Sequence, residues 1–217
     1  MTDGARPAAI VIAKAPRPGL CKTRLEPLLG ADGCARLQAV LVRRAASWAA
    51  AVGDVYVAFT PADAREEMAA LAPGATLIEQ ADGDLGDRLA AAIAEVLAAR
   101  GGGPVVLVGV DTPQLDASHA EAALDDLRAG VDVTFGPATD GGYYLVGMSE
   151  PHPEVFDLPS EAWGGSEVFG LTLAAAAGAG LSLGMLRSER DLDDASDVRA
   201  FLADPLMPGE LAELLRT

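Results

Sequence analysis

The sequence is poor in basic residues and in aromatic side chains. Its 217 residues hold 16 Lys and Arg against 32 Asp and Glu, which gives a formal net charge of −16. This balance disfavours nucleic acid and anionic membranes as partners, because both bind through a broad basic face. No apolar run approaches the roughly 18 residues of a membrane span, and the N-terminus lacks the hydrophobic centre of a signal peptide. We therefore expect a cytoplasmic protein without a membrane span.

Cysteine and histidine are also scarce, which excludes several kinds of chemistry. Cys21 and Cys34 form no CxxC pair and no Cys/His cluster, so a disulfide or zinc framework is disfavoured. His119 and His152 are the only histidines, and no G-x-S-x-G element accompanies them. The sequence therefore argues against a serine hydrolase.

Four of the 16 basic residues lie close together in one stretch of the chain, which holds both of its lysines and no acidic residue. This stretch follows an apolar run over 8–13 that is typical of a buried parallel strand. Gly19 and two prolines favour a loop there, and a basic, glycine-containing loop at the carboxyl end of a strand suits an anionic ligand such as a nucleotide phosphate. The alternative is a solvated turn whose cations face acidic surface elsewhere. The four cations are Lys14, Arg17, Lys22 and Arg24.

Neither of the two best-known phosphate loops is present after this strand. A P-loop requires G-x-x-x-x-G-K-[ST], whereas Gly19 is followed by Leu20 and Cys21 before Lys22-Thr23. The dinucleotide fingerprint G-x-G-x-x-G is absent as well. The hypothesis of a phosphate site therefore needs a third kind of loop.

Strand and helix patterns alternate along the rest of the chain, which predicts an α/β fold with a mostly parallel sheet. We find no internal repeat and no long linker, so we expect a single domain over residues 1–217. The segment 149–165 is rich in Pro, Glu and Trp and is predicted to be a long functional loop. The predicted strands cover 8–13, 55–60, 75–79, 104–110, 132–137, 143–148 and 181–186. The predicted helices cover 32–51, 62–71, a long helix that ends at 99, 117–129, 167–179 and a closing helix that opens within 190–197.

Aspartates follow the predicted strands on the side where ligands bind in parallel α/β folds. Asp111 follows the fourth strand, Asp140 follows the fifth, and Asp193 lies in a later loop. Carboxylates beside a phosphate loop suit Mg²⁺, which is held by one or two protein carboxylates while phosphates and water complete its shell. Each residue has a plainer interpretation: Asp111 and Asp193 as turn or capping residues, and Asp140 with its two glycines as a hairpin turn. Trp163, in a polar loop, is expected either in the core or stacked on a ligand ring.

Five segments of the sequence carry a family resemblance. In order, they are KAPRPGLCKTRL, GDLGDRL, VGVDTP, GPATDGGYYLVGM and DLDDASDV. Together they resemble a bacterial glycosyltransferase family of the GT-A type, whose members are also described as nucleotide-diphospho-sugar transferases, and some of which are assigned to arsenosugar pathways. The resemblance covers residues 8 to 203. The first loop is also similar to that of 2-phospholactate guanylyltransferases, which carry a comparable Lys-Ser-Arg-Leu, and molybdenum-cofactor guanylyltransferases are more distant relatives.

The resemblance implies a GT-A, Rossmann-like fold, a nucleotide or nucleotide-sugar donor, a small-molecule acceptor and Mg²⁺ or Mn²⁺ as cofactor. It implies metal ligation by Asp111 and Asp193, although Asp194-Ala195 stand where the family's late element carries Thr-Pro. Asp140 is the expected base for the acceptor, and Lys22 the expected catalytic cation. The expected nucleotide-binding residues are Lys14, Gly19, Lys22, Thr23, Arg24, Gly86, Arg88 and Asp111. The expected sugar or acceptor pocket comprises Gly141, Gly142, Tyr143 and Trp163.

Three functions follow from this pattern, in order of preference. The first is a glycosyltransferase that uses a nucleoside-diphosphate sugar. The second is a guanylyl- or cytidylyltransferase that releases pyrophosphate, because the same fold supports both reactions. The third is a GT-A domain that only binds a nucleotide or a partner. The base, the sugar and the acceptor stay open, as does the oligomeric state, with a homodimer as one option.

Overall fold

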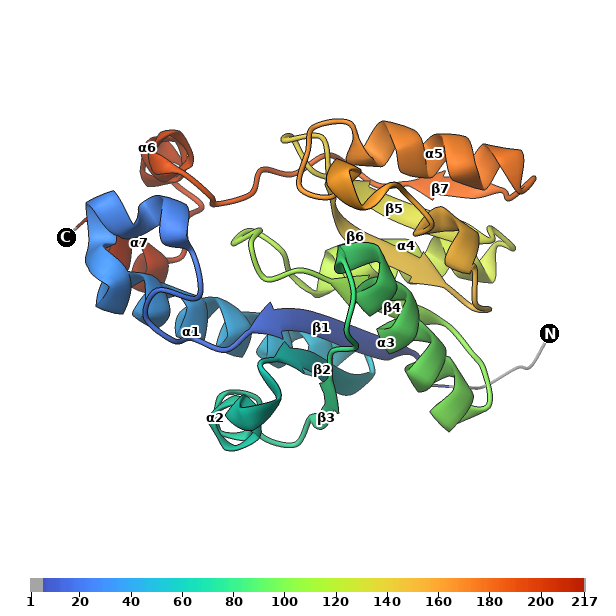
Figure 1. The fold of residues 1–217 in the computed structure, drawn as a ribbon, viewed down its shortest axis with the longest axis horizontal. Coiled ribbons are helices and arrows are strands. Elements are labelled where there is room, and N and C mark those ends of the chain that lie inside the picture. The colour runs from blue at the N-terminus through green and yellow to red at the C-terminus, as the bar shows by residue number, and fades with distance from the viewer. Residues whose placement is uncertain (1–5, 217) are drawn as a thin grey trace.

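The computed structural model describes residues 6–216, which form a seven-stranded sheet with helices packed against it (Figure 1). The order of the strands is β3-β2-β1-β4-β6-β5-β7. Their bounds are β1 Ala8–Lys14, β2 Asp54–Thr60, β3 Thr76–Glu79, β4 Val105–Val108, β5 Val133–Pro137, β6 Tyr143–Met148 and β7 Leu183–Met185.

All strands but one run in the same direction. β1 pairs in parallel with β2 and β4, and β2 pairs in parallel with β3. β6 is antiparallel to both of its neighbours, β4 and β5, and β7 joins β5 in parallel. The prediction of an α/β fold with a mostly parallel sheet is therefore confirmed.

The helices follow the strands in the alternation that the sequence predicts. α1 is interrupted at Gly30, whose φ of +68° is not helical, so the regular helix begins close to the predicted start at residue 32. A final helix, α7, was not predicted. The helices are α1 Glu26–Val52, α2 Arg65–Leu71, α3 Leu85–Arg100, α4 Ala117–Arg128, α5 Val168–Gly178, α6 Ala195–Ala203 and α7 Gly209–Leu215, with short 3-10 turns at Thr23–Leu25, Ala62–Ala64, Pro153–Val155 and Ser160–Ala162.

β1 lies in the middle of the sheet and is buried on both of its faces. Since alternate residues of a strand point to opposite faces, Ala9 and Val11 join a core cluster with side chains of α1 and α4. Ala8 and Ile10 join a second cluster with side chains of α3. This two-sided burial explains why β1 has an unbroken apolar sequence.

The pairing of the central strands brings three chain segments to one edge of the sheet. Val11 of β1 lies opposite Val108 of β4, so Lys14 and Asp111 both lie three residues beyond this pair. Leu145 of β6 pairs with Val108 from the other side. Because β6 runs the opposite way, its first residue, Tyr143, lies at the same edge as Lys14 and Asp111.

Among residues 6–216, no helix is both long and apolar enough to cross a membrane.

Substitution of a leucine in the core should destabilise the protein far more than the same change at the surface. Leu37 of α1 is fully buried, whereas Leu206 is 86% exposed. We expect Leu37→Ala to lower the free energy of unfolding by about 2–5 kcal/mol, because it removes buried apolar surface and leaves a cavity. Leu206→Ala should leave it within about 0.5 kcal/mol. Equal denaturation midpoints for the two variants would contradict the packing of α1 against β1.

Candidate active site

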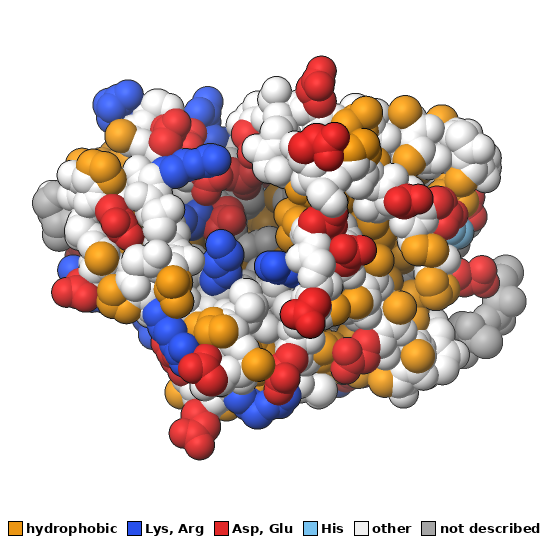
Figure 2. All heavy atoms as spheres, viewed as in Figure 1, with side chains coloured by type: hydrophobic (Ala, Val, Ile, Leu, Met, Phe, Trp, Pro, Cys, Tyr) orange, Lys and Arg blue, Asp and Glu red, His pale blue; other side chains and the backbone are white. Residues whose placement is uncertain are grey.

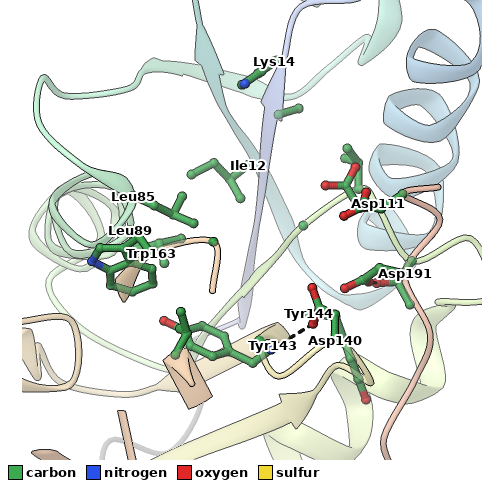
Figure 3. A pocket seen from close by; sticks show the side chains of 18 of the residues that line it. Ile12, Lys14, Leu85, Leu89, Asp111, Asp140, Tyr143, Tyr144, Trp163 and Asp191 are labelled. Carbon is green, nitrogen blue, oxygen red and sulfur yellow. Dashed lines mark hydrogen bonds between the residues drawn. The ribbon is translucent and has the colours of Figure 1, made fainter. Parts of the chain in front are cut away.

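A cavity of about 470 Å³ opens at the carboxyl ends of β1 and β4. This volume is in the range of small-molecule sites. Its lining combines the loop after β1, the start of α3, the segment after β4, the start of β6 and residues 191 and 193. Figure 2 shows the surface hollowed near the middle of this face, with Lys and Arg side chains on its left and lower sides and hydrophobic side chains on its right. Figure 3 shows the interior from close by.

The four cations of the loop after β1 do not all face this cavity. Arg17 turns away from it and forms ion pairs with Asp63 at 2.9 Å and Glu67 at 3.1 Å, beside α2. Lys14 lines the cavity, and no ion pair involves its ammonium group within the described chain. Arg24 also lines the cavity and is exposed, with only a long contact of 3.8 Å to Asp193. Lys14 and Arg24 are therefore the cations of this loop that are available to an anionic ligand.

Lys22 has a different environment from the other cations. Its side chain is only 4% exposed, and its Nζ lies 2.8 Å from Asp111 Oδ1 and 3.1 Å from Asp193 Oδ1. It also donates a hydrogen bond of 2.6 Å to the carbonyl of Leu192. An ammonium group has three hydrogens, so these three acceptors satisfy it completely. Burial lowers the pKa of Lys22, but the two carboxylates more than offset this and raise it above its ordinary value.

The backbone at Lys22 is also unusual, which supports this role as a bridge. Its φ of +50° makes it the one residue other than glycine with a left-handed backbone among residues 6–216. Such a conformation is costly for a residue with a side chain. It turns the chain into the 3-10 turn Thr23–Leu25. The two ion pairs and the hydrogen bond of the ammonium group offset this cost.

The segment that carries the late aspartates is fixed against the sheet by backbone hydrogen bonds. The Glu189 amide donates to the Pro137 carbonyl at 3.0 Å, and the Leu192 amide donates to the Asp111 carbonyl at 2.8 Å. The Glu189 side chain adds contacts to His119 and Arg187. These contacts hold residues 191 and 193 beside the end of β4.

Asp191 is a member of the site that the sequence did not single out. Its carboxylate accepts a hydrogen bond from the Thr112 hydroxyl. The pKa of Asp191 is raised to about 7, first by burial and then by the neighbouring carboxylates of Asp140, Asp111 and Asp193, while the Thr112 hydroxyl acts in the opposite direction. In Figure 3 the carboxylates of Asp111, Asp140 and Asp191 lie on one side of the open space. The only signal in the sequence was the position of Asp191 two residues before Asp193.

Apolar and aromatic side chains form the opposite side of the cavity. Ile12, Leu85, Leu89 and Trp163 lie across the open space from the carboxylates (Figure 3), and Tyr143 lies at its base. The Tyr143 ring is held by edge contacts with Phe135 and burial raises the pKa of its hydroxyl. Trp163 packs on the core and also lines the cavity, so its stacking on a ligand ring stays a prediction.

Two glycines allow the loops around the cavity to approach closely. A Cβ on Gly86 would lie 2.5 Å from the Trp163 ring and 2.5 Å from the Phe156 carbonyl. A Cβ on Gly141 would lie 2.0 Å from the Ser166 carbonyl, so the space beside Gly141 is filled by the protein itself. The Gly142 amide donates to Asp140 Oδ1 at 2.9 Å, which leaves the other oxygen of Asp140 without a partner in the described structure.

Most residues that the sequence singled out line this one cavity. Gly19, Gly86 and Gly141 do not line it but shape the loops around it. Sequence reasoning missed Asp191, Thr112, Gln80 and Leu85. The predicted residues in the lining are Lys14, Lys22, Thr23, Arg24, Arg88, Asp111, Asp140, Gly142, Tyr143, Trp163 and Asp193.

The carboxylates offer the oxygen ligands that Mg²⁺ and Mn²⁺ prefer. Asp111 gives one oxygen to Lys22 and its side chain is half exposed, so its second oxygen is available to an ion. No group of three His, Cys, Asp or Glu residues within the described chain forms a ready cage for a metal. This arrangement fits an ion such as Mg²⁺, which needs only one or two protein carboxylates beside phosphate and water oxygens.

The fold and the cavity define an α/β protein of the nucleotide-diphospho-sugar transferase type of fold. Its structure matches that of a "putative nucleotide-diphospho-sugar transferase" from Desulfovibrio desulfuricans G20, with a TM-score of 0.87, 30% identity and coverage of 98% of this chain and 95% of that chain. A CMP:2-keto-3-deoxy-manno-octonic acid synthetase complexed with CTP shares the fold at a TM-score of 0.56, with 18% identity over 92% of this chain and 99% of the other. A cytidylyltransferase from Leptospira borgpetersenii gives a TM-score of 0.59, with 13% identity over 98% of this chain and 93% of the other.

The chain belongs to the family described as "Uncharacterized protein conserved in bacteria (DUF2064)", whose model matches residues 34–163. A comparison with curated proteins finds no match. The residues that match the family model include most of α1, the central strand β4 and most of the apolar side of the cavity, but not the loop after β1.

The stability of the metal-free protein should depend on pH through Asp191. Its pKa in the folded state, about 7, lies above the ordinary value of 3.8. The folded state therefore binds more protons than the unfolded state between these values, so stability should fall as the pH rises from about 4 to 7, by at most about 1.4 kcal/mol per pH unit. Asp191→Asn should flatten this decline in denaturation experiments with a chelator present. The exposed Asp157→Asn is the control, and an unchanged pH profile in Asp191→Asn would show that Asp191 is ionised throughout.

Enlargement of Gly86 should displace Trp163 without unfolding the protein. The added methyl group of Gly86→Ala would collide with the indole ring and with the Phe156 carbonyl, so both should shift and the fluorescence of the ring should change. Trp48→Phe is the background for this experiment, because it makes Trp163 the only tryptophan. Gly178→Ala is the matched control, since a Cβ at Gly178 meets nothing within 4 Å. Identical Trp163 emission spectra in both variants would contradict the contact.

Proposed function

We propose that this protein is a metal-dependent glycosyltransferase that transfers a sugar from a nucleoside-diphosphate sugar to a small-molecule acceptor. The observation that carries the proposal is the position of the basic loop after β1 directly across from Asp111, at the edge where parallel α/β sheets bind ligands. The relative from Desulfovibrio desulfuricans supports the same class of donor. So does the resemblance of the five sequence segments to the glycosyltransferase family that includes arsenosugar-pathway members.

The donor phosphates are expected on the basic side of the cavity. Lys14 and Arg24 supply cations that are not already paired at close range, and Thr23 also lines the cavity. Arg88, at the start of α3, extends this side toward the nucleoside. A direct contact of Lys22 with a phosphate stays a prediction. It requires the ammonium group to exchange one of its three protein acceptors for a phosphate oxygen.

The carboxylates serve the cation and the acceptor in this proposal. Asp111 would hold Mg²⁺ or Mn²⁺ through its available oxygen, with Asp193 as the second expected ligand once Lys22 releases it. When bound, the ion neutralises the charge that develops on the leaving diphosphate. Asp140 is exposed and has one oxygen without a partner in the described structure, so it can accept the proton of an acceptor hydroxyl.

A nucleotidyltransferase is the second candidate, because two structures with this fold are a CTP-bound synthetase and a cytidylyltransferase. Such an enzyme releases pyrophosphate from a nucleoside triphosphate. The guanylyltransferase resemblance of the first loop belongs to this alternative. Its second substrate would occupy the same apolar side of the cavity.

The two candidates give different products, which makes the central experiment simple. Purified protein with Mn²⁺ is incubated with a panel of nucleoside-diphosphate sugars and, separately, with nucleoside triphosphates. We expect slow release of a nucleoside diphosphate from one sugar nucleotide even without an acceptor. Asp111→Asn should reduce this rate by about 100-fold or more, because the loss of one charge-stabilising group costs roughly 3 kcal/mol in the transition state.

Thermal unfolding of Asp111→Asn provides the control for this experiment, since a variant that has lost its fold would be inactive for another reason. Pyrophosphate release from a triphosphate, with every sugar nucleotide inert, would overturn the glycosyltransferase proposal in favour of the second candidate. Full activity of Asp111→Asn at limiting Mn²⁺ would overturn the assignment of the metal ligand.

A further inference from the structure

We propose that the second substrate of this site carries no anionic group and is an uncharged or cationic molecule with a ring or other apolar body. This inference rests on the proposed function, because it concerns the acceptor side of the same cavity. It goes further by assigning a chemical class to a substrate that neither the fold nor the relatives specify.

The first argument is the separation of charge within the cavity. All the cations that line it come from the first half of the chain, namely Lys14, Lys22, Arg24 and Arg88. The other side is built by β6, the segment that precedes α5 and the start of α5, and it contributes no Lys, Arg or His to the lining. Figure 2 shows the same separation, with blue side chains on the left and lower sides of the hollow and none on its right side.

The sequence extends this observation beyond the lining. Between residues 129 and 186 the chain contains no Lys and no Arg, and it contains seven Asp and Glu residues. A site that binds a carboxylate or a phosphate ester normally supplies an Arg or Lys for it. No described loop on this side carries a side chain that could do so. An anionic second substrate would therefore be bound without a counter-ion from its own side of the cavity.

The second argument is the presence of carboxylates that are not neutralised. Lys22 is already satisfied by Asp111, Asp193 and the Leu192 carbonyl. Asp140 forms no ion pair within the described structure, and its second oxygen is free for a hydroxyl or an ammonium group. An anion placed here would be repelled by this carboxylate, and such repulsion is a common source of specificity.

The third argument is the apolar surface that faces these carboxylates. Trp163, Leu85 and Val168 lie in the lining, together with Tyr143 at its base. Phe135 and Phe169 hold the Tyr143 ring, with centroids at 5.3 Å and 6.2 Å. A preformed aromatic wall opposite a free carboxylate suits a molecule with a ring or apolar body that ends in a hydroxyl or amine. The anion-binding part of the cavity is left to the donor.

Three probes with the same ring separate charge from shape. These are benzyl alcohol, 4-(aminomethyl)benzyl alcohol and 4-(hydroxymethyl)benzoate, which are neutral, cationic and anionic. Binding is measured from Trp163 fluorescence in Trp48→Phe protein at a fixed concentration of Mn²⁺. We expect the neutral and cationic probes to bind at least 10-fold more tightly than the benzoate. Equal or tighter binding of the benzoate would overturn the proposal, and so would the failure of all three probes to change the Trp163 signal.

A charge variant tests the cause of this preference. Leu85 lies in the lining and is 43% exposed, so Leu85→Lys places a cation on the apolar side of the cavity. It should improve binding of the benzoate by at least 10-fold. Leu171→Lys is the matched control, because Leu171 is 38% exposed but outside the lining, and it should leave all three affinities unchanged. If Leu85→Lys leaves benzoate binding unchanged, charge is not the reason for the selectivity and the proposal fails.

These measurements do not require turnover, so they are independent of the proposed reaction. A protein that releases no product from any donor but prefers the neutral and cationic probes would refute the proposed function alone. A protein that is active but prefers the benzoate would refute this inference alone.

Discussion

The ammonium group of Lys22 is the interaction on which the geometry of the cavity depends. It joins the loop after β1 to Asp111 beyond β4 and to Leu192 and Asp193 near the end of the chain. Backbone hydrogen bonds of Glu189 and Leu192 hold the late segment beside the sheet, and the buried cation ties the loop after β1 to that segment and to Asp111. A buried ion pair of this kind gains its value from satisfied geometry, and all three ammonium hydrogens have acceptors here. The left-handed backbone of Lys22 is the local cost of that position.

The sheet explains why cations and carboxylates line the same cavity although some of them do not pair with each other. Parallel pairing of β1 with β4 places Lys14 and Asp111 at one edge, and the reversed strand β6 returns Tyr143 to the same edge. The loop after β1 and Arg88 of α3 supply the cations of the cavity, whereas β6 and the segment before α5 supply none. A ligand that spans the cavity meets cations from the loop after β1, and farther along it lies between the carboxylates and the apolar surface that faces them. This arrangement suits the proposed combination of a charged donor with an uncharged partner group.

Much of this could be predicted from the sequence, because the strongest signals were local. The apolar runs, the Gly and Pro positions and the strand-helix alternation located the strands of the sheet and most helices to within a few residues. The loop after β1 and Asp111 were found because they follow buried strands. Long-range pairing could not be predicted in the same way. Nothing in the sequence indicates that Arg17 contacts α2 or that Lys22 is buried between two aspartates. The hydrogen bond from the Thr112 hydroxyl to the Asp191 carboxylate has no signal in the sequence either. These features depend on contacts between residues more than 45 positions apart.

The bridge formed by Lys22 also has a consequence for the order in which the protein is made. Lys22 and Asp193 are separated by 171 positions, so the loop after β1 leaves the ribosome long before its partner segment is synthesised. Until then, the sheet can form from β1 to β4 while Lys22 has only Asp111 as a carboxylate partner. The site is therefore completed only after residues 189–193 have been synthesised and dock against the sheet, and α7 packs against α1. A nascent chain that stalls before this point would have most of its core but no finished cavity.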